Sequence, residues 1–153
     1  MEPISADEFG SIFTQSLIDV ISKTTGFSLD ILSTAPDTDF NEIVALMYLN
    51  SNKGGMIFIS AGEPTLCTLC SYMEGDSRDK ITTVDIEDVL CELVNMTAGN
   101  AKLQLSNIGY LFKLSSPFII SGKNLSIRTK KRVNIVSRTI GNGEITVKLK
   151  IIY

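Results

Sequence analysis

The sequence predicts an α+β fold with two layers, a largely antiparallel β-sheet and helices packed on one face of it. Apolar residues recur at helical spacing in long segments of the earlier part of the chain, and they alternate with polar residues near its C-terminus. Strand-like segments are joined by hairpin signals and do not alternate regularly with helices, which disfavours a parallel sheet. With 153 residues, the chain can bury a substantial core, and we expect a single domain over residues 1–153.

The expected helices span residues 5–24, 63–74 and 83–108. Ser5 and Glu8 have the spacing of a capping box, in which each side chain binds a free backbone N–H group of the other residue. Thr82 and Asp85 repeat this spacing at the start of the third helix. Pro64 is in the first turn of the second helix, where the missing N–H costs nothing. These signals fix where the helices begin.

The expected strands span residues 27–32, 42–49, 54–60, 133–139 and 145–151, with further strands around residues 111 and 118. The last strand should have one packed and one wet face, the packed one formed by Ile145, Val147, Leu149 and Ile151 and the wet one by Thr146, Lys148 and Lys150. Gly141-Asn142-Gly143 predicts a hairpin turn before it, and the NSNKG segment predicts another at residues 50–54.

Charge is unevenly spread along a chain with a net charge of −3. Residues 1–100 hold 4 basic and 16 acidic side chains, whereas residues 101–153 hold 10 basic and 1 acidic. The basic cluster consists of Arg128, Lys130, Lys131 and Arg132. It could be a nucleic-acid patch or a solvated strand face, and the second is favoured because no aromatic platform accompanies it. We therefore expect no nucleic-acid partner.

The sequence also indicates in which cellular compartment the protein is expected. The N-terminus, MEPISADEFG, contains acidic residues and no basic one, so it does not predict a secretory signal. The longest apolar run, Ile43–Leu49, is too short to cross a bilayer. We expect a soluble, cytoplasmic protein that does not insert into membranes.

The chain has three cysteines and no histidine, so it offers few possible metal ligands and few groups for nucleophilic catalysis. Cys67 and Cys70 have the spacing of half a zinc site or of a redox pair, but no second pair completes a metal shell. They also fall on the apolar stripe of the second helix, which favours buried thiols that act as small hydrophobic groups. We expect no metal ion and no cofactor bound by this chain, and covalent catalysis or a histidine base is disfavoured.

The third helix has an unusual polar face. At about 100° per residue its apolar stripe contains Ile86, Leu90, Leu93, Thr97, Ala101 and Ile108, and its opposite stripe contains Asp88, Glu92, Asn95, Gly99, Lys102 and Ser106. A glycine in an exposed helix interior costs about 1 kcal/mol relative to alanine. Gly99 therefore suggests a place where a partner approaches closely, and we expect Thr97 or Ala98 to supply further small residues there.

Glu92 and Asn95 lie one turn apart on this face. A carboxylate can bind a lysine, and an amide can orient a water molecule without changing its own charge. On its own, a solvated helix face is the simpler interpretation of the pair.

The segment ELVNMTAGNAK on this helix resembles the signature of the CheC–FliY–CheX family of chemotaxis phosphatases, most closely the CheX branch. The resemblance extends to the segments TTGF, GGMIFIS and SSPFIISGKN and covers most of the chain, although the C-terminal hairpin matches only in general pattern. Some members carry two Glu-x-x-Asn helices, but the first helix here reads Gln15-Ser16-Leu17-Ile18 and the chain has one motif, as in the CheX branch.

The resemblance implies a CheX-like phosphatase that hydrolyses the phospho-aspartate of a CheY-like response regulator. It implies that Glu92 contacts a lysine of the regulator and that Asn95 orients the attacking water. The required Mg²⁺ would belong to the regulator's receiver domain, and the protein would be a homodimer joined through sheet edges. The alternative is a non-catalytic module that binds a receiver domain in a two-component pathway.

Overall fold

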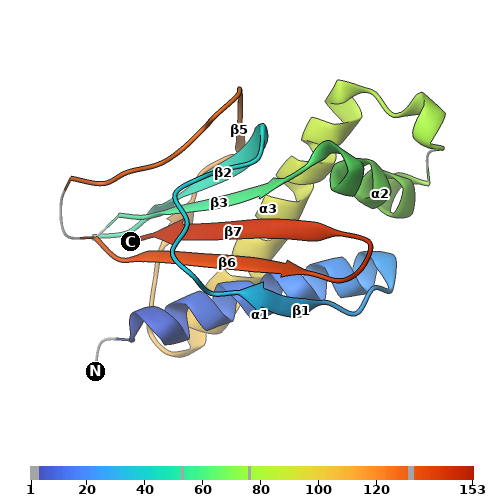
Figure 1. The fold of residues 1–153 in the computed structure, drawn as a ribbon. Helices are drawn as coiled ribbons and strands as arrows, with labels where there is room; N and C mark the ends of the chain where they lie inside the picture. The colour runs from blue at the N-terminus through green and yellow to red at the C-terminus, as the bar shows by residue number, and fades with distance from the viewer. Residues whose placement is uncertain (1–3, 53, 76, 131–132) are drawn as a thin grey trace.

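The computed structural model describes residues 4–52, 54–75, 77–130 and 133–153, and within them a seven-stranded sheet carries three α-helices (Figure 1). In chain order the elements are α1 (Ala6–Thr25), β1 (Asp30–Ser33), β2 (Ile43–Asn50), β3 (Met56–Ala61), α2 (Glu63–Glu74), a 3-10 turn (Arg78–Lys80), α3 (Thr83–Asn107), β4 (Lys113–Leu114), β5 (Phe118–Ser121), β6 (Ile135–Gly141) and β7 (Thr146–Ile152). The predicted fold class is confirmed.

All strand pairs between these elements are antiparallel, and the strand order is β1-β6-β7-β3-β2-β4, with β5 also paired to β2. The main hydrophobic core joins all three helices to one face of this sheet. In Figure 1, α3 crosses the sheet, and α1 and α2 pack against α3 on its two sides. Thus α3 is the central helix of the helical layer.

The predicted capping boxes are present at both long helices. Glu8 N–H donates to Ser5 Oγ at 3.1 Å, and Ser5 N–H donates to Glu8 Oε2 at 3.0 Å. The same reciprocal bonds join Thr82 and Asp85 at the start of α3. These bonds satisfy N–H groups that have no partner inside the helix. Because the bonds require side chains at this spacing, the spacing in the sequence correctly predicts both helix starts.

The other face of the sheet carries a smaller apolar cluster and an unexpected ion pair. Val44, Leu46 and Phe58 form the cluster, and the segment between β1 and β2 (cyan in Figure 1) crosses this face. Lys150 Nζ donates to the backbone oxygen of Asp37 in this segment at 2.7 Å and lies 3.5 Å from its carboxylate. Lys150 is therefore only 2% exposed, and the expectation that its side chain lies on a wet face is wrong.

The Asp37 carboxylate is held by several groups. The backbone N–H of Asp39, a hydrogen bond from Lys148 at 3.0 Å and the charge of Lys150 together lower the pKa of Asp37 from 3.8 to about 2. Burial lowers the pKa of Lys150, although Asp37 opposes that change. A strand pattern of alternating apolar and polar residues cannot reveal such a covering segment, because the segment comes from more than a hundred residues away in sequence.

Candidate functional site

Glu92 and Asn95 lie on the exposed side of α3, one turn apart, as the sequence predicts. The intervening residues Leu93 and Val94 are fully buried in the main core and fix the rotation of the helix. Neither the Glu92 side chain nor the Asn95 side chain has a hydrogen bond or ion pair with another residue that the structure describes. Both polar groups are therefore held on a rigid element and remain free to bind a partner.

An open cavity of about 540 Å³ lies beside this helix face. It is lined by Asp88, Cys91, Glu92 and Asn95 of α3 and by Leu114, Ser115, Ser116 and Pro117 of the segment between β4 and β5. The structure thus adds a second wall to the site that the helix alone predicted. The chain reverses direction after α3 at Gly109, which has a φ of 84°, and the returning residues run back toward Asn95.

Reasoning from the sequence missed this second wall. The segment SSPFIISGKN carries part of the family resemblance and an expected strand around residue 118, but nothing in its composition places it beside Asn95. A partial signal was present, because Gly109 after a long helix predicts that the helix ends and the chain changes direction there. Which residues then reach the helix face depends on the strand register, which local sequence does not determine.

The charge of the site is negative. Asp88 and Glu92 both line the cavity, and no described cation forms an ion pair with either of them. Burial, together with the carboxylates of Asp88 and Glu87, raises the pKa of the Cys91 thiol. Because the thiolate is the nucleophilic form of cysteine, this thiol is held in its unreactive state. The site is suited to a cationic contact and to hydrogen bonding.

The small residues of α3 fall on two different faces. A Cβ atom at Gly99 would meet no heavy atom within 4 Å outside the adjacent helix backbone, so the face is sterically open there. Thr97 and Ala98, by contrast, are each 0% exposed. The expectation that Thr97 or Ala98 contacts a partner is therefore wrong, because residues two or three positions after Asn95 rotate toward the core. Of the three, only Gly99 remains a candidate.

The other described residues that the sequence singled out as possible metal, redox or nucleic-acid sites do not line this cavity. Cys70 is buried in the main core and Cys67 is half-buried against it, which agrees with the packing role predicted for both thiols. Arg128 and Lys130 are exposed, while Lys131 and Arg132 lie outside the described residues. Within the described parts of the chain, no group of three or more metal-ligating side chains could hold a metal ion. None of the described helices has the length and apolarity needed to span a bilayer.

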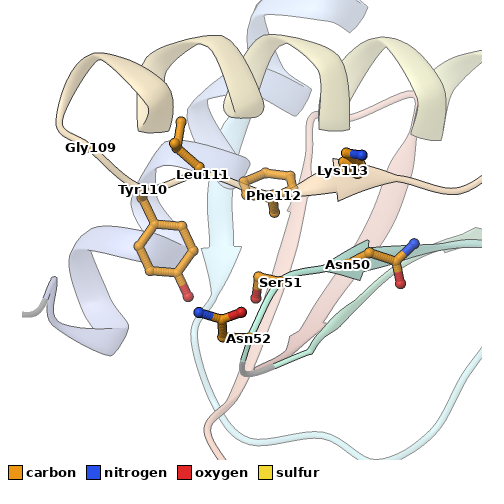
Figure 2. A pocket seen from close by; sticks show the side chains of 8 residues that line it. All are labelled: Asn50, Ser51, Asn52, Gly109, Tyr110, Leu111, Phe112 and Lys113. Carbon is orange, nitrogen blue, oxygen red and sulfur yellow. The ribbon is translucent and has the colours of Figure 1, made fainter.

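A second pocket, of about 530 Å³, lies between the β2–β3 turn and the residues that follow α3 (Figure 2). Its lining residues are Asn50, Ser51, Asn52, Gly109, Tyr110, Leu111, Phe112 and Lys113. Figure 2 shows the Tyr110 ring directed toward Asn52 across this pocket. None of the described residues that line it is a carboxylate, so it does not repeat the pairing of Glu92 with Asn95.

Comparison with known proteins places the chain in a family. The family model described as chemotaxis phosphatase CheX matches residues 43–140, which is more than half of the chain and includes α3 and both walls of the cavity. No curated protein matches the sequence.

Solved structures share the fold along nearly the whole chain. A CheC-like superfamily protein from Shewanella sp. PV-4 is 24% identical with a TM-score of 0.84, and the match covers 97% of this chain and 98% of that one. The chemotaxis protein CheX from Vibrio vulnificus is 22% identical with a TM-score of 0.83 over 95% and 98% of the two chains.

A third similar structure comes from a CheX–CheY–BeF₃–Mg²⁺ complex of Borrelia burgdorferi. It is 16% identical with a TM-score of 0.74 and covers 94% of this chain and 96% of that chain. At these identities, the structural matches show a common fold, and the family model supplies the assignment. The protein belongs to the CheX family of chemotaxis phosphatases.

Proposed function

We propose that this protein accelerates hydrolysis of the phospho-aspartate of a CheY-like response regulator. The observation that carries the proposal is a pair of polar side chains, Glu92 and Asn95, that bond to no described residue and lie on the exposed face of a helix whose other face is buried in the core. Membership of the CheX family supports it. The Borrelia burgdorferi neighbour, a CheX crystallised with CheY, BeF₃ and Mg²⁺, supports the choice of partner.

The proposed mechanism depends on positioning. An acyl phosphate is already activated, so a water molecule held in line with the phosphorus is sufficient to accelerate its loss. The Asn95 amide offers a donor and an acceptor to such a water and stays neutral near the negative phosphoryl group. Glu92, one turn away, binds a lysine of the regulator and so orients the docked complex. The Mg²⁺ that neutralises the phosphoryl oxygens is held by the regulator, and this chain contributes no ligand to it.

Asn95→Ala tests the catalytic role. We expect the variant to lose the acceleration of phosphate release from a receiver domain charged with acetyl phosphate, while its thermal unfolding is unchanged because the side chain faces solvent. Asn100→Ala is the matched control, since Asn100 is an exposed amide of the same helix that does not line the cavity. Hydrolysis at the wild-type rate in Asn95→Ala would disprove the assignment.

Glu92→Ala tests the binding role. We expect a higher KM for the phosphorylated receiver and a smaller effect on kcat, because the carboxylate contacts the partner and not the attacking water. Glu144→Ala, which removes an exposed carboxylate in the β6–β7 turn, controls for the change in net charge. Normal affinity together with lost turnover would contradict this role. If the wild-type protein binds the phosphorylated receiver without faster hydrolysis, the protein is instead a non-catalytic receiver-binding module.

We also propose a homodimer joined through the sheet edge formed by β5. Among the described strands β5 pairs only with β2, which leaves its other side open. Phe118, Ile120 and Tyr48 are each more than 40% exposed near this edge, which favours cover by a second chain. Sedimentation should detect a dimer that Ile120→Lys disrupts. The cytoplasmic location expected from the sequence is part of the proposal, and cell fractionation would test it.

A further inference from the structure

The second wall of the cavity is a bulge in the sheet. Strands β4 and β5 both pair with β2, and Leu114 lies opposite Leu49 while Phe118 lies opposite Leu46. Two residues of β2 separate these positions, but three residues, Ser115–Pro117, separate them on the other strand. One extra residue on one strand of an antiparallel pair is a β-bulge.

A serine hydroxyl closes the hydrogen-bond ladder across this bulge. The backbone N–H of Ser115 donates to the carbonyl oxygen of Tyr48 at 3.1 Å, as in a regular ladder. The return bond is different, because the N–H of Tyr48 donates to Ser115 Oγ at 2.8 Å instead of to a backbone carbonyl. The hydroxyl in turn donates to the carbonyl oxygen of Ser116 at 2.9 Å. Ser115 thereby ties the start of the bulge to β2 and fixes the next peptide group.

The bulge displaces residues toward the site. Ser116 is exposed and Pro117 half-buried, and both line the cavity opposite Glu92 and Asn95. β-bulges commonly occur beside active sites, where they redirect side chains. Pro117 cannot donate a backbone hydrogen bond, so the bulge depends more heavily on the Ser115 hydroxyl for its attachment to the sheet.

We infer that Ser115 is a positioning residue for receiver docking, because its hydroxyl holds the Ser115–Pro117 bulge as the second wall of the Asn95 cavity. The inference rests on the proposed function, since it takes the receiver domain as the occupant of that cavity. Ser115 itself does not touch the reacting atoms. It sets how far Ser116 and Pro117 stand from the helix, and so it determines how tightly a receiver fits.

Ser115→Ala tests the inference. The variant removes the acceptor of the Tyr48 N–H, and the loosened wall should raise KM for the phosphorylated receiver about tenfold, the effect of roughly one hydrogen bond. kcat should stay near the wild-type value, because Asn95 remains in place on α3. Ser115→Thr keeps the hydroxyl and should restore KM. Ser121→Ala, at an exposed serine of β5 outside the cavity, is the matched control and should leave KM unchanged.

A second variant keeps the inference testable if Ser115→Ala folds poorly. Ser116→Arg places a large side chain at an exposed position of the wall and should raise KM at least tenfold with an unchanged melting temperature. An unchanged KM in Ser115→Ala would overturn the inference, and so would a lowered Tm in that variant without a change in KM. If Ser115→Ala does not fold, an unchanged KM in Ser116→Arg would overturn it.

Failure of the inference differs from failure of the proposed function. Only the inference is overturned if the wild type accelerates hydrolysis, if Asn95→Ala loses that acceleration, and if the serine variants behave like the wild type. If the wild type neither binds the phosphorylated receiver nor accelerates its hydrolysis, both are overturned.

Discussion

Replacing Gly99 with alanine should stabilise the protein and at the same time weaken its activity. The position is in the interior of α3, and an added Cβ would meet no heavy atom within 4 Å outside the adjacent helix backbone. Alanine is favoured over glycine inside a helix by about 0.8–1.0 kcal/mol. A change of this size raises the melting temperature of a chain of this length by roughly 2–4 °C. The fold itself therefore gives no reason for a glycine here.

The expected loss of activity has a separate physical origin. Gly99 follows Asn95 by one helical turn on the polar face, so a methyl group there would stand between α3 and a docked receiver. A methyl group forced into a well-packed contact costs about 1–3 kcal/mol, which corresponds to a KM raised by roughly 5- to 150-fold. Stability and activity should thus change in opposite directions.

The assay combines thermal unfolding with initial rates of phosphate release over a range of receiver concentrations. Gly10→Ala is the matched control, because it offers the same gain in helix propensity in α1 but places its Cβ 2.6 Å from Val136 Cγ1. Gly10→Ala should be destabilised and Gly99→Ala stabilised. A stabilised Gly99→Ala with an unchanged KM would refute the idea that the receiver packs against this part of α3.

Three further predictions follow from buried and charged groups. Thr97→Val should increase the free energy of unfolding in urea by about 1 kcal/mol, because the buried Thr97 hydroxyl has no hydrogen-bond partner within the described residues; a clear decrease would reveal a bond to it. Asp37→Asn should destabilise the protein most above pH 4, and its difference from wild type should shrink as the pH falls toward 2, because the lowered pKa of Asp37 stabilises the fold only while the carboxylate is ionised. An unfolding difference independent of pH would contradict the ion pair with Lys150. Cys91→Ala should keep wild-type turnover because the thiol stays protonated, and lost turnover would contradict a non-covalent mechanism.

Local signals in the sequence were sufficient to locate the helices. Both capping boxes mark true helix starts, and α2 has the predicted bounds, Glu63–Glu74, with Pro64 in its first turn. Strand bounds were less accurate, since β1 begins at Asp30 instead of residue 27 and β6 runs to Gly141 instead of residue 139. Helix ends are encoded by neighbouring residues, whereas strand ends depend on partners distant in sequence.

The same distinction explains what could be predicted of the site. Glu92, Asn95 and Gly99 share one helix, so the helical period alone placed them on one exposed face. The Ser115–Pro117 wall could not be predicted, because it depends on a one-residue change of register between β4 and β5 along β2. The burial of Lys150 also escaped prediction, because it depends on the loop that carries Asp37.

The stability of the fold does not explain the residue types on the exposed face of α3. Gly99 lowers helix stability, and the polar groups of Glu92 and Asn95 bond to no described residue, although the two residues beside them are completely buried. A merely solvated face would tolerate alanine at position 99 and has no need of an adjoining cavity. The open cavity, the amide that bonds to no described residue and the glycine without a steric cause are explained together if the missing contacts are made by another protein. The buried face of the same helix then has a functional role, because it keeps Asn95 in a fixed place when that protein docks.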